Sequence, residues 1–160
     1  MNGYKYSKAA AEANKIIKEL HIATPPVDPL EVADYLGVKV SEIEMPEKFE
    51  KVSGFMDFTT KEIVLNKDDS SKRKAFTIAH ELGHLVLHGT KYIQNPSSYN
   101  VLFRLSELNE NSDEEKEANT FAACLLAPKE MLKTYSDVPE GIKAKIFGVS
   151  PTLLKYRNKF

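Results

Sequence analysis

Cysteine and long apolar runs are almost missing from this chain, and both absences exclude classes of protein. Cys124 is the only cysteine among 160 residues, which excludes an internal disulfide, and its apolar helical surroundings predict a packing role. No apolar run approaches the roughly 20 residues that a membrane helix needs. The N-terminus lacks the continuous apolar core of a signal peptide. We therefore expect a cytoplasmic protein without a membrane-spanning segment.

An excess of charge of one sign is missing as well. The chain has 22 Lys and Arg against 23 Asp and Glu, a net charge of −1, which gives no global reason to bind nucleic acid or a membrane surface. Hydrophobic residues make up 42% and charged residues 28% of the chain, as in folded globular proteins. At 160 residues we expect one compact domain with room for a small appendage.

The most informative pattern that is present is His80-Glu81-Leu82-Gly83-His84. Residues four apart on an α-helix lie on one face, one turn apart, so both imidazoles can reach the same metal ion. Zn²⁺ binds neutral His nitrogens, and a Glu beside the first His can act as general base on water at the metal. The pattern predicts His80 and His84 as zinc ligands and Glu81 as the catalytic base.

The residues around this motif predict a long amphipathic helix. Helix-start signals occur at Asp69, Ser70 and Ser71, and Gly89 offers a stop signal after His88. A core-facing stripe consists of Ala75, Phe76, Ile78, Ala79, Leu82, Leu85 and Val86, and a polar stripe beside it consists of Thr77, His80, Glu81, His84 and His88. Gly83 costs about 1 kcal/mol relative to Ala inside a helix, so we expect close packing or access at that point.

A catalytic zinc site needs a third protein ligand and a position left open for water. His88 shares the face of the two motif histidines, but it lies two turns from His80, roughly 12 Å along the axis. We expect it instead at the helix end, where it would interact with terminal carbonyls and line the edge of the cleft. The third ligand is then expected on a second helix.

The second helix is predicted over residues 112–127. Its buried face consists of Ala118, Phe121, Ala122, Leu125 and Leu126. Glu115 and Asn119 lie on the margin of this face, one turn apart, whereas Glu117 is expected to point to solvent. Glu115 is thus the predicted ligand, and Asn119 is predicted to orient a ligating His by a hydrogen bond.

Two alternatives to this ligand choice stay open. Glu114 also lies near the inner face of the second helix and is the main rival to Glu115. In addition, Ser112 and Glu115 form a capping box, which would occupy the same carboxylate.

The remaining elements predict an α+β protein. The expected helices cover 7–21, 30–36, 128–135, 143–147 and the residues after 151, and the expected strands cover 38–43, 54–58 and 62–65. Residues 59–61 predict a hairpin between the last two strands, and 95–98 predict a loop within the unassigned stretch 90–110. The last strand is expected to offer an open sheet edge that binds the substrate backbone through Ile63, Val64 and Leu65. Tyr92, Tyr99 and His88 are unranked candidates for stabilising the oxyanion.

Two segments of the chain resemble the motifs of one family. The first is Phe76-Thr77-Ile78-Ala79-His80-Glu81-Leu82-Gly83-His84. The second is Glu115-Lys116-Glu117-Ala118-Asn119-Thr120-Phe121-Ala122-Ala123, followed by Leu125-Leu126-Ala127-Pro128. Together they resemble the ImmA/IrrE family of zinc metallopeptidases. The resemblance covers residues 7–130. It implies a small zincin-like domain of the gluzincin type, over 1–128, with a short mixed or antiparallel sheet packed on the motif helix. It also implies one Zn²⁺ per chain, held by the two His and by the Glu of Glu115 to Asn119.

The same resemblance implies a function. Family members act in bacteria or their mobile elements by cleaving a helix-turn-helix repressor, often one encoded nearby, and so derepress genes. Residues 129–160 resemble the helix-turn-helix-like end of many relatives, with Gly148 in the turn and basic residues on the last helix. Contact with DNA is one role for this end, but its shortness favours packing. The competing function is a DNA- or repressor-binding regulator whose metal site is structural or silent.

Overall fold

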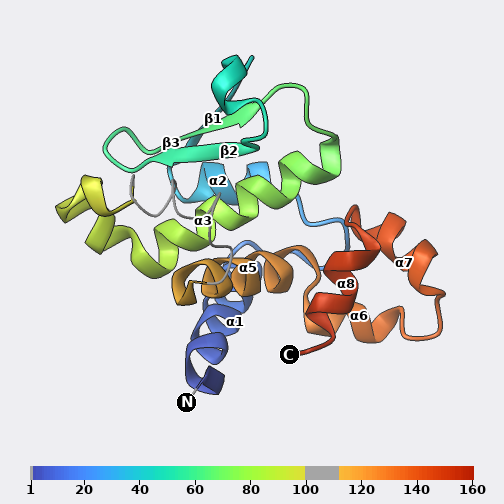
Figure 1. Ribbon diagram of the computed structural model, residues 1–160. Coiled ribbons are helices and arrows are strands. Elements are labelled where there is room, and N and C mark those ends of the chain that lie inside the picture. Colours follow the sequence, from blue (N-terminus) through green and yellow to red (C-terminus); the bar gives the residue numbers. More distant parts are fainter. Residues whose placement is uncertain (1, 100–111) are drawn as a thin grey trace.

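The computed structural model describes residues 2–99 and 112–160, and they form the expected α+β fold. Figure 1 shows the order of layers, with the sheet on α3, α3 on α5 and α5 on α1. The described elements are α1 (Asn2–Glu19), α2 (Pro29–Tyr35), β1 (Lys39–Ile43), η1 (Glu47–Phe49), β2 (Gly54–Asp57), β3 (Glu62–Asn66), α3 (Ser71–Gln94), α5 (Asp113–Leu126), α6 (Lys129–Thr134), α7 (Glu140–Phe147) and α8 (Pro151–Arg157). None of the helices within the described ranges is long and apolar enough to cross a membrane.

The three strands form a mixed sheet in the order β1-β3-β2. β1 pairs with β3 in parallel and β2 pairs with β3 antiparallel, through the hairpin expected at 59–61. The expectation that Ile63, Val64 and Leu65 lie at an open edge is wrong, because β3 is the central strand and both of its sides are paired. The reason is the non-local partner: Val40 of β1 is in register with Ile63, and such a pairing across the chain leaves no local signal.

α3 carries the His-rich motif and is longer than expected. It begins after Ser70, whose hydroxyl accepts a hydrogen bond from Arg73 N at 3.2 Å. The expected stop at Gly89 is wrong, since α3 continues to Gln94. Tyr92, in the added turn, is fully buried and contacts Phe58 with ring centroids 4.9 Å apart. Packing of this ring therefore outweighs the glycine signal. Residues 96–98, expected in a loop, are helical, and so is Tyr99 of the unassigned stretch, whereas residues 100–111 lie outside the described chain.

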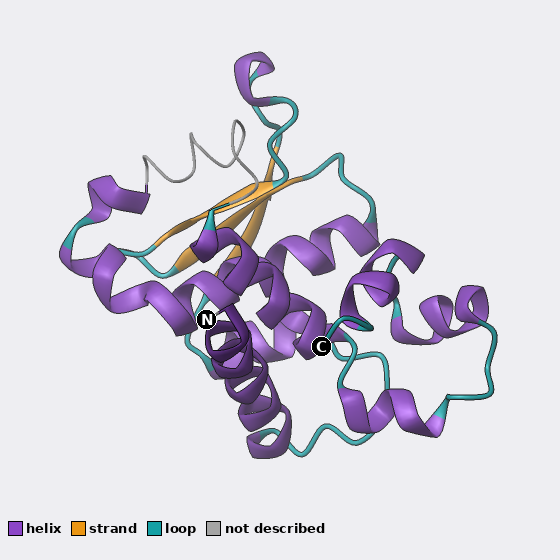
Figure 2. Cartoon of the chain, turned by 60° about the horizontal axis from the view of Figure 1, so that its bottom comes forward, coloured by secondary structure: helices purple, strands orange, loops and turns teal. Residues whose placement is uncertain are grey.

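The helices gather on one side of the sheet (Figure 2), and α5 lies among them in contact with α1, α3 and α8. Its expected apolar face is buried, and Thr120, Ala123 and Cys124 are buried as well, because α1, α3 and α8 all pack against this helix. Arg157 of α8 donates a hydrogen bond from Nε to Ala127 O at 2.9 Å, just after α5. Residues 129–160 thus share one hydrophobic core with the rest of the chain. A separate unit beginning at residue 129 stays a prediction.

Candidate metal centre

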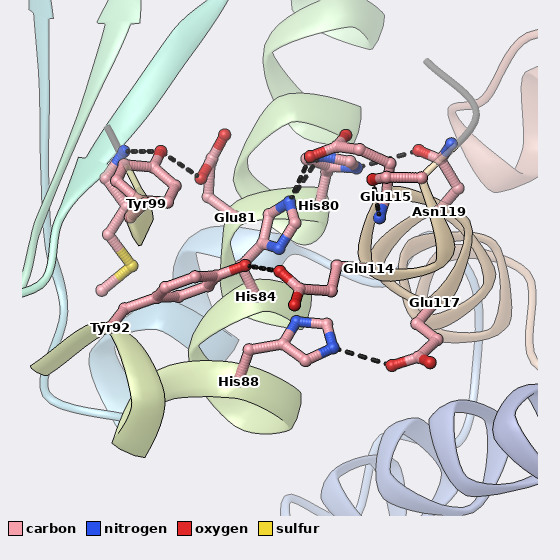
Figure 3. Close-up of polar contacts among 12 residues, drawn as sticks. His80, Glu81, His84, His88, Tyr92, Tyr99, Glu114, Glu115, Glu117 and Asn119 are labelled. Carbon is pink, nitrogen blue, oxygen red and sulfur yellow. Dashed lines mark hydrogen bonds and ion pairs between the residues drawn. The ribbon is translucent and has the colours of Figure 1, made fainter. Parts of the chain in front are cut away.

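Three side chains from α3 and α5 converge on one point (Figure 3). His80 Nε2 and His84 Nε2 lie 3.1 Å apart. The Glu115 carboxylate places Oε2 at 3.1 Å from His80 Nε2 and Oε1 at 3.0 Å from His84 Nε2. Within the described ranges this is the one cluster of His, Cys, Asp or Glu whose ligand atoms converge as a metal site requires. The motif histidines and the carboxylate expected from the second helix are therefore brought together.

The spacing of these atoms suits a small divalent ion. Zn²⁺ binds nitrogen and carboxylate oxygen at about 2.0–2.2 Å, so two ligands of a tetrahedral site lie about 3.3 Å apart. The three distances of 3.0–3.1 Å are close to that value. The donor set, two imidazoles and one carboxylate, also leaves a fourth position for solvent, as catalytic zinc sites do. The residues present therefore fit the ion that the sequence predicts.

The hydrogen bond of Asn119 determines how His80 faces the centre. Asn119 Oδ1 lies 2.9 Å from His80 Nδ1. An amide oxygen can only accept, so Nδ1 carries a proton, and Nε2, which faces Glu115 and His84, is the nitrogen that would bind a metal ion. This is the contact expected for Asn119 from its position one turn after Glu115.

Burial and mutual contact shift the pKa values of the three converging groups. Burial lowers the pKa of His84 to about 4, so its ring is neutral. Burial also lowers the pKa of His80, but the hydrogen bond with Glu115 and the nearby carboxylates outweigh it and the net pKa is raised. Burial raises the pKa of Glu115, yet its hydrogen bonds with His80 and His84 hold it well below the usual range. Glu115 is thus a carboxylate at any ordinary pH.

Glu81 lies beside this cluster in a different environment. Its side chain is buried, and burial raises the pKa of its carboxyl group to about 7. The Tyr99 hydroxyl donates a hydrogen bond to Glu81 Oε2 at 3.0 Å and accepts one from Met56 N at 2.8 Å. A carboxyl group with a pKa near neutrality can both take and return a proton. The sequence left Tyr99 unranked, because its contact with Glu81 depends on the fold around residues 95–99.

The cluster opens into a cleft of about 750 Å³. Its walls come from the segment before β2, from α3 and α5, and from the first turns of α8. Tyr99 is among the lining residues, together with His80, Glu81, His84, Glu115 and Asn119. A cleft of this size accommodates several residues of a peptide chain.

His88 and Glu117 do not occupy the places expected from the sequence. His88 is not at the helix end, since α3 continues past it, and its Nε2 lies 2.7 Å from Glu117 Oε2. Glu117 is thus turned toward α3 instead of solvent. The reason is that α5 packs directly on α3, so a polar residue on the flank of one helix meets the flank of the other. Neither residue lines the described cleft.

The contacts of Glu114 and Ser112 favour Glu115 among the alternatives left open for the third ligand. Glu114 accepts hydrogen bonds from Tyr92 Oη and Lys91 Nζ, away from the two converging histidines. Ser112 caps α5 by accepting from Glu115 N at 3.2 Å. The cap uses the backbone of Glu115, which leaves its carboxylate to contact both rings.

The fold and the site define an α+β protein with a candidate metal centre, and comparison with known proteins identifies a family that supports a metallopeptidase-type or regulator-related role. The chain belongs to the Peptidase M78 family: its model, described as the IrrE N-terminal-like domain, matches residues 33–159. This confirms the family expected from the motifs. No curated protein gave a significant match.

A solved structure shares this fold. A Mycobacterium tuberculosis transcriptional regulator superimposes with a TM-score of 0.66 at 18% sequence identity, over 94% of this chain. The match covers 46% of that regulator, so this chain spans just under half its length. At this identity the likeness establishes the fold alone.

Proposed function

We propose that this protein is a zinc metallopeptidase that binds one Zn²⁺ per chain through His80, His84 and Glu115. The observation that carries the proposal is the convergence of these three groups at 3.0–3.1 Å, with Glu81 beside them in an open cleft. A divalent ion held there supplies a Lewis acid that polarises a carbonyl and acidifies water. The family to which the chain belongs is consistent with peptide-bond hydrolysis.

Glu81 is the proton carrier in this reaction. It takes a proton from the attacking water and passes it to the leaving amine, a role supported by its pKa, which burial raises to about 7. Tyr99 holds the carboxylate in place through its hydroxyl. Of the three oxyanion candidates, only Tyr99 lines the cleft within the described chain. Its hydroxyl is therefore the proposed donor to the negative charge that develops on the scissile carbonyl oxygen.

The proposed substrate is a helix-turn-helix repressor encoded near this protein, as the family resemblance implies. Cleavage of such a repressor in the cytoplasm would derepress the genes it controls, in a mobile element or a stress response. The test is incubation of the purified protein with that repressor, with and without a chelator, followed by gel electrophoresis. We expect discrete fragments that disappear with chelator and return when Zn²⁺ is added. An intact repressor in all zinc-loaded reactions would contradict the proposal.

The second candidate function is a DNA- or repressor-binding regulator with a structural or silent metal site. It is favoured by the solved structure of similar fold, which is a transcriptional regulator, and by the basic residues of α8. A mobility shift of DNA that weakens with salt would support it. Absence of such a shift, together with zinc-dependent cleavage of the repressor, would exclude it.

A further inference from the structure

The first two turns of α8 face the metal centre. Ser150, Thr152, Leu153 and Tyr156 line the same cleft as His80 and Glu115. In a helix-turn-helix unit the corresponding part of the second helix reads the bases of DNA. Here this part is turned toward the candidate site. The only cationic residue in the middle of α8 that stays exposed is Lys155, which does not line the cleft.

α8 is held rigidly against the helix that carries Glu115. Arg157 is almost fully buried and donates from Nε to Ala127 O at 2.9 Å. One residue earlier, Tyr156 Oη lies 3.2 Å from Oγ1 of Thr120, which follows Asn119 on α5. These contacts hold α8 at a constant distance from the proposed metal ligands. A surface that selects substrate side chains needs such a fixed position.

The cleft wall at α8 combines the exposed polar side chains of Ser150 and Thr152 with four apolar or aromatic ones. Three nearly buried apolar side chains each expose a small part of their surface to the cleft. They are Leu126 at the end of α5, Val149 before α8 and Leu153 on α8. The half-buried ring of Tyr156 extends this surface, and its polar hydroxyl is already occupied by Thr120. On the opposite side, Phe76 lies against His80 with ring centroids 5.9 Å apart. An apolar surface thus continues up to the metal centre.

We propose that α8 forms an apolar subsite of the peptidase cleft that selects a large aliphatic or aromatic side chain at one of the two residues flanking the scissile bond. This inference rests on the proposed peptidase function and adds the substrate class. Because the buried core of a folded protein holds such side chains, the substrate segment must be extended and exposed when it is bound. The helix-turn-helix-like end of this chain thereby serves peptide selection instead of DNA reading.

The test uses the full chain in two forms. Zinc-loaded Glu81→Gln measures binding, by fluorescence anisotropy, of labelled dodecapeptides whose central residue is Leu, Phe, Ala or Asp. The zinc-loaded wild type is incubated with the same peptides, and the cleavage sites are mapped by mass spectrometry. We expect the Leu and Phe peptides to bind at least about tenfold more tightly than the Ala and Asp peptides, because several methylene groups are buried. Cleavage next to Leu or Phe should be faster by a similar factor.

Leu153 and Leu154 provide a matched pair of variants. Both are buried leucines on α8, at 7% and 2% exposure, but only Leu153 lines the cleft. Leu153→Ala enlarges the subsite and is expected to shift the preference from Leu toward Phe, whereas Leu154→Ala leaves the preference unchanged. If Leu153→Ala does not fold, the exposed Thr152→Asp is used, and we expect it to weaken the binding of Leu and Phe peptides severalfold.

The outcomes separate the subsite from the enzyme. Peptide cleavage without apolar preference, or an equal shift in Leu154→Ala, would overturn the subsite while the peptidase stands. Selective binding without any cleavage would overturn the peptidase and retain the subsite. Absence of peptide binding to the zinc-loaded protein would overturn both. Binding of duplex DNA that Thr152→Asp weakens, without peptide selection, would assign α8 to DNA.

Discussion

Glu81 and Glu115 are two buried carboxyl groups in one cluster whose environments push their pKa values apart. Glu115 accepts hydrogen bonds from both histidines, which hold its pKa well below the usual range against the effect of burial. Glu81 accepts a hydrogen bond from the Tyr99 hydroxyl, but burial is the larger effect and raises the pKa of Glu81 to about 7. Such a separation fits the proposed roles, in which Glu115 keeps its charge and Glu81 transfers a proton.

Substitution at residue 81 and at residue 84 should therefore have different consequences. Glu81→Gln removes the proton acceptor but none of the metal ligands, so we expect it to bind Zn²⁺ normally and to lose at least about 100-fold in cleavage rate. His84→Ala removes a ligand and should lose both. Metal content by elemental analysis and repressor cleavage by gel measure the two effects. Full cleavage by Glu81→Gln would refute the assignment of the base.

Zinc affinity should depend on pH through His80. Its pKa is raised above 6.5, and a ligating ring must lose its proton. Below pH 6.5 the affinity is expected to fall about tenfold per pH unit, because one proton competes with each ion. The pKa of His84 is lowered to about 4, so a second proton competes with the zinc ion only near pH 4. Competition with a chromophoric chelator across the pH range measures the slope. Two protons per ion already at about pH 6 would contradict this order.

At the scale of elements, the site depends on the close approach of α3 and α5. A Cβ atom at Gly83 would lie 3.1 Å from Phe121 Cδ1 and 3.2 Å from the Cα and O atoms of Ala118. The absence of a side chain at Gly83 lets α5 lie against the motif and bring Glu115 to the two histidines. The close packing that the sequence predicts at this glycine is thus present.

Gly83→Ala tests this approach. Overpacking costs about 1–3 kcal/mol, and the gain of about 1 kcal/mol in helix propensity offsets part of it. We expect a net loss of up to about 2 kcal/mol in the free energy of unfolding, and weaker zinc binding because Glu115 moves away. Gly89→Ala is the control, since its Cβ would meet mainly the flexible end of Leu85 at 3.2 Å. Urea denaturation and zinc titration give both quantities. Equal zinc affinity in the two variants would refute the close-approach argument.

The elements and most of the site could be predicted from local pattern. The helix start at Ser70 and the approach of Glu115 to His80 and His84 follow from caps, helical periodicity and family motifs. What could not be predicted depends on contacts between distant segments. β3 pairs with β1 on the side opposite β2, and Glu117 pairs with His88. α3 extends beyond Gly89 because the ring of Tyr92 is buried. None of these partners is specified by the residues next to it.

At the scale of the whole molecule, the proposed metal ligands belong to the two helices around which the rest of the described chain packs. α3 supports the sheet, and α5 contacts α1 and α8. An ion that joins α3 to α5 therefore ties together the sheet, α1 and α8. Binding to the native state alone stabilises a protein by about 2.7 kcal/mol at a ligand concentration of 100 times the dissociation constant.

Zinc is thus expected to raise the melting temperature of the entire domain, by roughly 5–11 °C at that concentration for a chain of this size. Differential scanning calorimetry of the metal-free and the zinc-loaded protein measures the shift, which His84→Ala should abolish. Glu117→Gln is the matched control, because the pair of Glu117 with His88 also joins α5 to α3 but supplies no ligand. This variant should melt lower than the wild type and still gain stability from zinc. A single transition that moves as a whole would show that α8 and the metal centre belong to one cooperative unit, whereas a second transition insensitive to zinc would separate residues 129–160 from it.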